Sequence, residues 1–412
     1  MQKKKILVLS DHALSTSGVG TQTRHLINGL IAKDDWTFRQ LGAAMKHSDY
    51  RTIIVNDDFI IKPIDGFGTK DMLRITLATE KPDLILIFTD PRFFGWLFEM
   101  EDEIHQVCPI AWWHVWDNWP KPSFNAPFYE STDLINCHSY LTYEICKQDF
   151  PDKTNFIPHA LPDELFFPLT AEQRSAKRAE ILGPKKNNFI LFWVNRNARR
   201  KRPSDVIEAW SIFMRKIERE GRLDATLIMH TDPFDQEGPN LHEVSKLFGV
   251  QDSVIFSIER IDFEKMNDLH NISDACINIS YAEGFGLATL EAMQCGRPII
   301  AAMTGGLTRQ VIDHRDGSEN GVALPIEFKT CVGSQVVPYI YEDYVSNEAT
   351  AAAIEKLFRL SPEERTALGE KARAYVKSEF NYQKTIDAWH ETLNKTISDW
   401  KENYRSWKKV TI

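Results

Sequence analysis

The sequence has few cysteines, and no pair of them is spaced to bind a metal or to form a redox motif. Six cysteines occur among 412 residues, with no C-x-x-C pair. Several lie within apolar runs, so we expect buried free thiols and a reducing, cytoplasmic environment. We expect no metal site. The six are Cys108, Cys137, Cys146, Cys276, Cys295 and Cys331.

Long hydrophobic runs are also missing. No stretch approaches the roughly 18 apolar residues of a membrane-spanning helix. The apolar run at residues 6–9 is short and stops at Ser10 and Asp11, which is not typical of a signal peptide. We therefore expect a cytoplasmic protein.

An excess of positive charge is absent as well. The formal net charge is −9, and residues 1–170 are the more acidic part of the chain. This balance disfavours a polyanionic partner such as nucleic acid. The sequence contains no internal repeat and no low-complexity tract.

Short apolar runs alternate with helical patterns through most of the chain. This alternation predicts an α/β fold with parallel sheets, and the length corresponds to about two domains. The proline-rich stretch at 156–168 is the best candidate boundary, and residues 322–348 are expected to be irregular. Strands are predicted at 6–9, 53–55, 84–88, 109–114, 134–137, 189–194, 225–230, 254–256, 275–280 and 298–301.

The most informative stretch is 281–300, which follows an apolar strand. Gly284 and Gly286 interrupt the strand pattern, and apolar residues then recur at helical spacing. Backbone N–H groups at such a helix start, together with the helix dipole, favour an anion such as phosphate. Glu283 and Glu291 bracket the turn, and carboxylates accept hydrogen bonds from hydroxyl groups. The turn therefore predicts a ligand with both a phosphate and a polyol.

A basic loop at 195–202 lies between a predicted strand and a helix that begins at Pro203. A solvated surface loop or a nucleic-acid patch would have the same composition. Its place between a strand end and a helix start instead favours a pyrophosphate clamp.

The first half contains two weaker signals. Ser17-Gly-Val-Gly20 places glycines between the first strand and the first helix, which suits close approach of a phosphate. It lacks the third glycine of a dinucleotide fingerprint, so a plain turn is an equal alternative. His114 and Asp117 follow a strand, where ligand groups gather in open α/β sheets, although a lone histidine is more often structural.

These residues together resemble the E-x7-E signature of retaining glycosyltransferases with the GT-B fold, from Glu283 to Glu291 and on through residue 299. Residues 156–163 resemble the segment that leads into that family's second domain. Arg196 and Lys201 resemble its Gly-Arg-x4-Lys pair, and residues 304–306 match its later glycine pair.

The sequence departs from the family pattern at several positions. Asn195 replaces the usual glycine before the arginine, and Arg202 stands where a glycine often follows the lysine. Residues 230–233 replace a glycine-rich strand end. An acidic residue after the glycine pair is not evident, because Thr308, Arg309 and Gln310 occupy that region.

The resemblance implies two Rossmann-like domains facing across a cleft. An acceptor-side domain would span 1–168 and a nucleotide-sugar donor domain 169–380. A helical segment at 381–412 would pack back on the first domain, with the last helical pattern running from Tyr382 to about Trp407.

The resemblance also implies roles for particular residues. Arg196 and Lys201 would neutralise the donor diphosphate in place of a metal, and Glu291 would bind the ribose hydroxyls. Glu283 would hold the donor sugar, with His114 nearby. The expected catalytic set is therefore His114, Glu283, Arg196 and Lys201. The expected donor contacts are Gly18, Gly20, Arg196, Lys201, Gly284, Phe285, Gly286, Leu287 and Glu291.

The implied reaction is metal-independent transfer of a hexose, with retention, from a UDP- or GDP-linked sugar to a hydroxyl group, without a cofactor. Retention by double displacement would use Glu283 as nucleophile, and same-face attack is the favoured route. A glycan, lipid-linked sugar or small molecule is the expected acceptor, nucleic acid is less favoured, and a peripheral membrane contact stays open. A sugar-nucleotide epimerase, a phosphorylase, an NAD-dependent dehydrogenase and a non-catalytic sugar- or nucleic-acid-binding protein are the alternatives.

Overall fold

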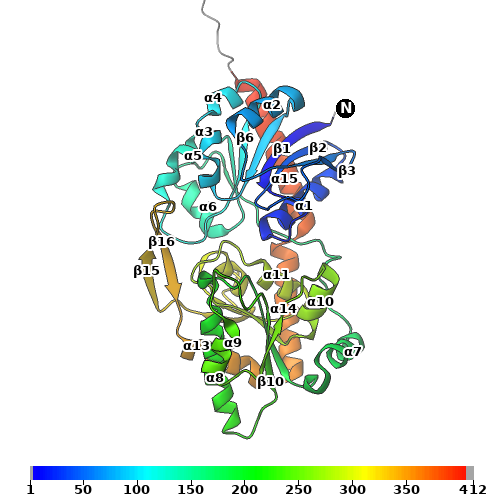
Figure 1. The fold of residues 1–412 in the computed structure, drawn as a ribbon, viewed down its shortest axis with the longest axis vertical. Helices are drawn as coiled ribbons and strands as arrows, with labels where there is room; N and C mark the ends of the chain where they lie inside the picture. The colour runs from blue at the N-terminus through cyan, green and yellow to red at the C-terminus, as the bar shows by residue number, and fades with distance from the viewer. Residues whose placement is uncertain (1–2, 405–412) are drawn as a thin grey trace, which may run out of the picture. The chain divides into compact units, whose positions relative to one another are not determined.

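The computed structural model describes residues 3–404, which divide into two compact units (Figure 1). The first unit contains the chain up to His159, residues 334–338 and the chain from Tyr382; the second contains Ala160–Gly333 and Tyr339–Asn381. The division therefore falls after His159, not after residue 168 as predicted. Leu161 and Phe166 explain the difference, because both are buried in an apolar cluster of the second unit.

The first unit is built on an eight-stranded sheet in the order β3-β4-β2-β1-β5-β6-β7-β8. All neighbouring strands are parallel except β3 and β4, which are antiparallel. The strands are β1 (Lys4–Asp11), β2 (Trp36–Ala43), β3 (Ile53–Asn56), β4 (Phe59–Pro63), β5 (Leu84–Phe88), β6 (Ile110–His114), β7 (Leu134–Cys137) and β8 (Thr154–Phe156).

Helices of the first unit pack on this sheet, and the last helix of the chain is among them. Helix α15 buries Ile386, Trp389 and Leu393 in the same apolar cluster as β1, β2 and α1. At Gly29, a Cβ would lie 2.4 Å from the Ile386 Cδ1 atom, so glycine permits close packing of α1 and α15. The helices are α1 (Gly18–Ile31), α2 (Lys70–Glu80), α3 (Gly95–Phe98), α4 (Glu101–Ile104), α5 (Ala126–Glu130), α6 (Tyr140–Lys147) and α15 (Tyr382–Asn403). The end of the predicted last segment, residues 405–412, lies outside the described residues.

Strand β2 is a central strand that the sequence does not predict. Its apolar alternation is interrupted by Gln40, which stands at a buried position, yet the whole strand pairs with β1. Gln40 is buried because its amide is fully used: its side chain donates to the Ser10 hydroxyl and the Asp11 carbonyl and accepts from the Ala13 N–H. A buried amide with these partners costs little free energy, so a polar residue fits the centre of this sheet.

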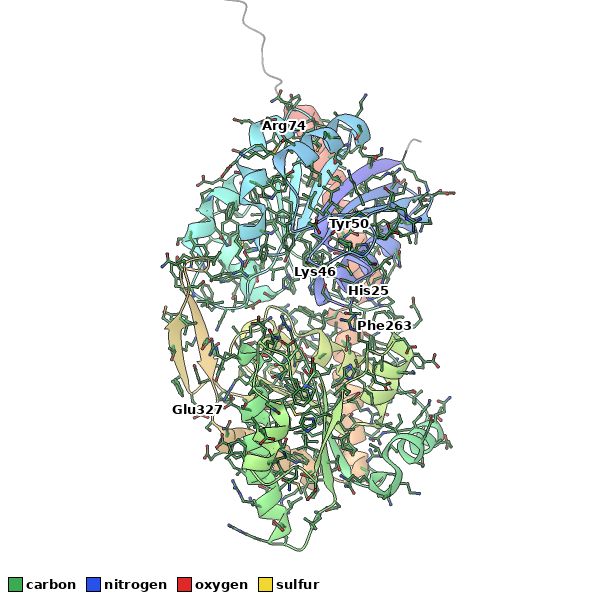
Figure 2. The ribbon with its side chains drawn as sticks, in the orientation of Figure 1. His25, Lys46, Tyr50, Arg74, Phe263 and Glu327 are labelled. Atoms are coloured by element: carbon green, nitrogen blue, oxygen red, sulfur yellow. The ribbon has the colours of Figure 1, made fainter. Side chains whose placement is uncertain are left out.

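The core of the first unit contains histidines that burial keeps neutral. Burial, with the nearby charge of Arg24, lowers the pKa of His25 (Figure 2) to about 4. Burial and the neighbouring His138 and His25 also lower the pKa of His159. An unfolded histidine takes up a proton near pH 6.5. Between about pH 6.5 and 4 the unfolded chain therefore binds more protons than the folded one, and the free energy of unfolding falls as the pH falls.

We therefore expect the protein to be less stable at pH 5 than at pH 7.5. His25 alone accounts for about 2 kcal/mol of this difference. Urea denaturation at both pH values measures the loss, and a His25→Gln variant should show a smaller one. His242→Gln, at an exposed position on α9, is the matched control. Equal pH dependence in the His25→Gln variant and the parent would contradict this assignment.

The second unit is built on a six-stranded parallel sheet in the order β11-β10-β9-β12-β13-β14, with a separate antiparallel hairpin, β15-β16. Its strands are β9 (Phe189–Val194), β10 (Ala225–His230), β11 (Val254–Ser257), β12 (Ala275–Asn278), β13 (Ile299–Ala302), β14 (Gly321–Leu324), β15 (Phe328–Val332) and β16 (Ile340–Tyr344). Its helices are α7 (Ala171–Leu182), α8 (Pro203–Glu218), α9 (Leu241–Leu247), α10 (Phe263–Ile272), α11 (Leu287–Gln294), α12 (Thr308–Val311), α13 (Asn347–Arg359) and α14 (Pro362–Glu379).

The expectation of an irregular segment at 322–348 is wrong. Strand β14 completes the sheet edge, and the hairpin follows it. The hairpin's first strand is mostly exposed and contains Lys329, Thr330 and Cys331, so it lacks the apolar run on which the strand predictions depend.

Candidate functional site

The turn after β12 has the strand–turn–helix form that the sequence predicts, and crowding explains one of its glycines, Gly286. Gly286 precedes α11 with a φ of 93°, a conformation that L side chains rarely adopt. A Cβ there would also lie 2.4 Å from the Leu307 Cδ2 atom. Only glycine therefore fits this corner without strain.

Glu283 and Lys201 form a buried ion pair beside this turn. The Lys201 Nζ donates to the Glu283 carboxylate, and both residues are only 8% exposed. Asn278 and Ser280 add hydrogen bonds to the same carboxylate oxygen, at 3.3 and 3.4 Å. The sequence assigned one residue to the phosphates and the other to the sugar, and the structure brings them into direct contact.

The charge state of Glu283 follows from this environment. Burial by itself would raise the pKa of the carboxyl group. The charges of Lys201 and Arg200 and the hydrogen bonds outweigh burial and lower the pKa to about 2. Glu283 is therefore ionised at neutral pH, and it can accept hydrogen bonds or attack as a nucleophile but cannot donate a proton.

The basic loop is joined to the turn through backbone as well as side chains. Tyr281 donates its N–H to the Arg200 carbonyl at 2.9 Å, and the Arg200 guanidinium donates to the Ala282 carbonyl at 3.2 Å. These bonds fix Lys201 next to Glu283. Arg196 lies at the exposed start of the loop, where its guanidinium donates two hydrogen bonds, of 2.7 and 3.1 Å, to Asp235.

Glu291 lies on α11 with its side chain 17% exposed. One of its carboxylate oxygens is 3.1 Å from the Nε2 atom of His270, a wholly buried residue of α10. His270 therefore orients the carboxylate, because a hydrogen bond to a buried ring restricts the rotation of the carboxylate. No sequence pattern indicated this partner.

Gln310 is the residue that holds the glycine turn in place. Its buried amide donates to the Phe285 carbonyl at 2.7 Å and to the Gly286 carbonyl at 3.1 Å, and its Oε1 accepts from Thr289. It stands in the region where the family often has an acidic residue. The Phe285 side chain is buried in a core cluster and packs edge-on against Phe380, with 5.6 Å between ring centroids.

In the first unit, Gly18 and Gly20 open α1, and crowding again explains one of them. A Cβ on Gly20 would lie 2.5 Å from the His12 carbonyl oxygen. Its N–H donates to the Ser17 hydroxyl, which caps the helix and itself donates to Asp11. Gly18 is exposed. Close approach of a diphosphate to these glycines stays a prediction.

His114 is enclosed within the first unit. Its ring is wholly buried, lies 4.1 Å from the Trp112 ring centroid and has its Nε2 atom 2.8 Å from the Tyr129 hydroxyl. These contacts give the ring a packing role in this structure. The role of His114 beside a donor sugar stays a prediction.

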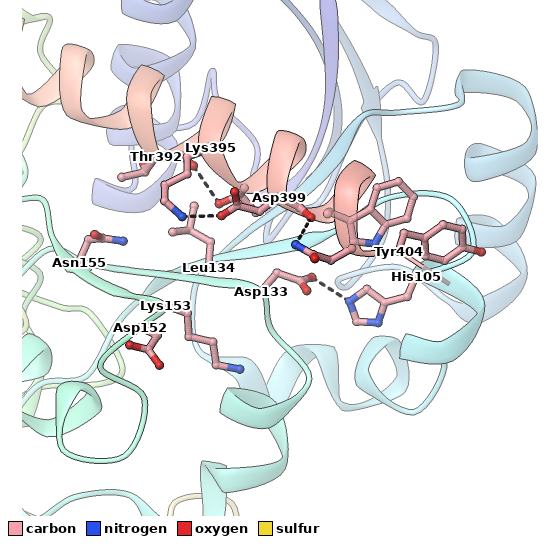
Figure 3. Close-up of a pocket in the computed structure, with 13 residues that line it drawn as sticks. His105, Asp133, Leu134, Asp152, Lys153, Asn155, Thr392, Lys395, Asp399 and Tyr404 are labelled. Atoms are coloured by element: carbon pink, nitrogen blue, oxygen red, sulfur yellow. Dashed lines mark hydrogen bonds and ion pairs between the residues drawn. The ribbon is translucent and has the colours of Figure 1, made fainter. Parts of the chain in front are cut away.

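A cavity of about 460 Å³ lies elsewhere in the first unit, at the amino ends of β7 and β8 and along the last turns of α15 (Figure 3). Its charges are largely paired: His105 contacts Asp133 at 2.8 Å, and Lys395 contacts Asp399. Within residues 3–404, no group of three or more His, Cys, Asp or Glu side chains is arranged to bind a metal ion. No helix in that range is long and apolar enough to cross a membrane.

Part of the second unit matches a known protein family. Residues 173–325 match the family described as glycosyl transferases group 1. The matched segment lies within the second unit. The glycosyltransferase resemblance seen in the sequence is thereby confirmed, and the Lys201–Glu283 pair and Gln310 lie inside the matched segment.

Curated proteins similar to this chain match over part of their length. One is D-inositol 3-phosphate glycosyltransferase 2 of Catenulispora acidiphila, 28% identical over 210 residues, which cover 48% of each chain. Another is N-acetyl-alpha-D-glucosaminyl L-malate synthase of Bacillus anthracis, 24% identical over 276 residues, 66% of this chain and 61% of the relative. The chain thus spans about half to three fifths of these relatives.

Solved structures match over nearly the whole chain. Sucrose-phosphate synthase from Thermosynechococcus elongatus has a TM-score of 0.75 at 18% identity, covering 96% of this chain and all of the other. The Anabaena protein HepE in complex with UDP and glucose has a TM-score of 0.68 at 17% identity, with 95% of this chain and all of the other covered. The predicted α/β architecture of the GT-B fold is confirmed.

The sequence analysis missed several residues that shape the candidate site. Asp235 and His270 lie on other elements from the residues they orient, and nothing in the local pattern indicated them. Gln310 could have been found, because it follows the Gly305-Gly306 pair by only one helical turn. Arg200 could have been found from its place beside Lys201 in the basic loop.

Proposed function

We propose that this chain is a glycosyltransferase that moves a hexose from a nucleotide-diphosphate sugar to a hydroxyl group, with retention and without a metal. The observation that carries the proposal is the buried Lys201–Glu283 pair at the glycine turn before α11. The pair places a cation, which can bind a phosphate, beside a carboxylate, which can bind hydroxyl groups. Both residues lie within the segment that matches the family.

The chemistry assigned to each residue follows from charge and position. Lys201 and Arg196 stabilise the diphosphate as it leaves, which is electrostatic stabilisation of charge that develops in the transition state. Glu291, oriented by His270, accepts hydrogen bonds from the ribose. Glu283 is ionised and holds the sugar hydroxyls. Same-face attack is our preferred route to retention, with double displacement through Glu283 as the alternative.

UDP is the donor nucleotide we favour, because solved structures of this fold include HepE complexes with UDP and with UDP-glucose. The names of the curated relatives point to different acceptors, D-inositol 3-phosphate and L-malate. They support a hydroxyl acceptor as a class and do not select one.

A donor screen tests the proposal. The full chain is incubated with UDP-, GDP- and ADP-hexoses, with and without EDTA, and nucleotide release is measured. We expect release from a UDP- or GDP-sugar that EDTA leaves unchanged, and a large loss of release in Glu283→Gln. No release from any donor would overturn the proposal. Full activity of Glu283→Gln would remove that residue from the site, and loss with EDTA would overturn metal independence.

A further inference from the structure

A second hollow of the first unit is lined by aromatic rings. This aromatic groove has a volume of about 380 Å³ and lies between the loop after β6 and helix α6. Half of its lining residues are aromatic, and the other half carry groups that donate or accept hydrogen bonds. The lining residues are Trp119, Tyr140, Tyr143, Glu144, Lys147 and Gln148.

Helix α6 supplies four of these side chains from one face, and Gln148, its C-cap, continues the stripe. They recur at spacings of three and four residues, which places them in a stripe along the helix. The opposite face, with Thr142, Ile145 and Cys146, is buried against the unit. The solvent-facing stripe of a helix usually carries charged and polar residues, whereas here two tyrosines stand at its head and line the groove.

The rings are held in place by neighbours. Tyr140 and Tyr143 both pack against Phe156, at 5.6 and 6.2 Å between ring centroids, and the Lys147 ammonium lies 5.0 Å from the Tyr143 ring. Trp119 donates its backbone N–H to the side chain of Asn118, a buried residue. The two tyrosine rings, restricted by these contacts, lose little entropy when a ligand binds.

The groove lies at the functional edge of the sheet. Trp119 follows β6 and Tyr140 follows β7, so both lie beyond the carboxyl ends of parallel strands, where open α/β sheets bind ligands. The larger cavity of Figure 3 lies at the amino ends of β7 and β8 instead.

The chemistry of the groove selects a class of ligand. Glu144 and Lys147 carry opposite charges, so the lining has no net charge to attract a phosphorylated molecule. A lipid chain would need no carboxylate or amide. A pyranose ring needs both kinds of group, because its C–H face packs on aromatic rings and its hydroxyl rim exchanges hydrogen bonds with Glu144, Lys147 and Gln148.

We propose that the aromatic groove binds a sugar unit of the acceptor, so that the acceptor is an oligosaccharide. This inference rests on the proposed glycosyltransferase function and names its acceptor class. The groove would hold a unit of the saccharide chain through stacking and hydroxyl contacts, which makes acceptor affinity depend on Trp119 and Tyr143.

Binding to the full chain tests this directly. Maltotriose, mannotriose and chitotriose are each titrated by calorimetry, in the absence of donor. We expect at least one to bind, and Trp119→Ala and Tyr143→Ala each to weaken binding about tenfold through lost stacking. Tyr143→Phe keeps the ring and should retain most of the affinity. Trp400→Ala, which removes an aromatic ring from the other cavity, is the matched control and should change nothing.

UDP is titrated into the same proteins, and its affinity should be equal in all of them. This measurement distinguishes a failure of the groove proposal from a failure of the proposed function, because the latter would appear as absent UDP binding in the parent protein. The inference is overturned if none of the three saccharides binds, or if binding survives both alanine substitutions. It is also overturned if inositol phosphate or phospholipid vesicles bind instead of the saccharides and that binding is lost in the Trp119→Ala variant.

Discussion

Replacing Lys201 with alanine is expected to reduce turnover by about 10²–10³-fold, because a preorganised charge aimed at the leaving group contributes an effect of that size. The same change leaves the Glu283 carboxylate buried without its nearest cation. Removing one partner of a buried pair costs about 3–5 kcal/mol of stability. Nucleotide-release kinetics and urea denaturation measure the two effects separately.

A double variant distinguishes lost chemistry from damaged folding. Lys201→Met with Glu283→Gln removes both charges while keeping side chains of similar size, so it should recover most of the stability that Lys201→Ala loses. It should stay inactive. Recovery of turnover in the double variant, or normal turnover in Lys201→Ala, would show that the pair is only structural.

Replacing Gly306 with alanine is the second change with a large expected effect. A Cβ at this position would lie 2.5 Å from the Phe285 Cα and 2.6 Å from the Gly284 carbonyl oxygen, which are backbone atoms of the glycine turn. The backbone must shift to make room, at a cost of about 1–3 kcal/mol. The shift moves the turn that would bind the donor, so UDP affinity, measured by calorimetry, should fall with stability.

Gly95→Ala is the control for this substitution. Gly95 has helical backbone angles, and nothing lies within 4 Å of an added Cβ. Alanine there should leave UDP affinity unchanged and raise stability by up to about 1 kcal/mol. Unchanged UDP affinity in Gly306→Ala would indicate that the turn does not contact the donor.

The sequence predicts those parts of the structure that depend on local pattern. Strands β9 and β10 have the predicted bounds because each is a run of apolar residues between polar loops. Strand β2 escaped prediction because Gln40 is polar and is satisfied only by β1 and the loop that follows it. The hairpin was not predicted because its first strand is exposed and has no apolar run.

The candidate site shows the same limit. The motif residues were identified because the glycines and carboxylates stand close together in the chain. The contact between Lys201 and Glu283 joins residues 82 positions apart, and the pairing of Glu291 with His270 joins two helices. Contacts of this kind depend on the order of the strands in the sheet, and a local sequence pattern does not predict that order.

The position of α15 has a consequence for how the chain folds during synthesis. Trp389 and its neighbours on this helix complete the core of the first unit, yet the whole second unit is translated before them. The first unit therefore leaves the ribosome with part of its apolar core uncovered, while the second has all of its own sequence. Since domains fold as units during translation, the second unit is the one able to finish first, and the nascent first unit is the part of the chain that needs protection from aggregation.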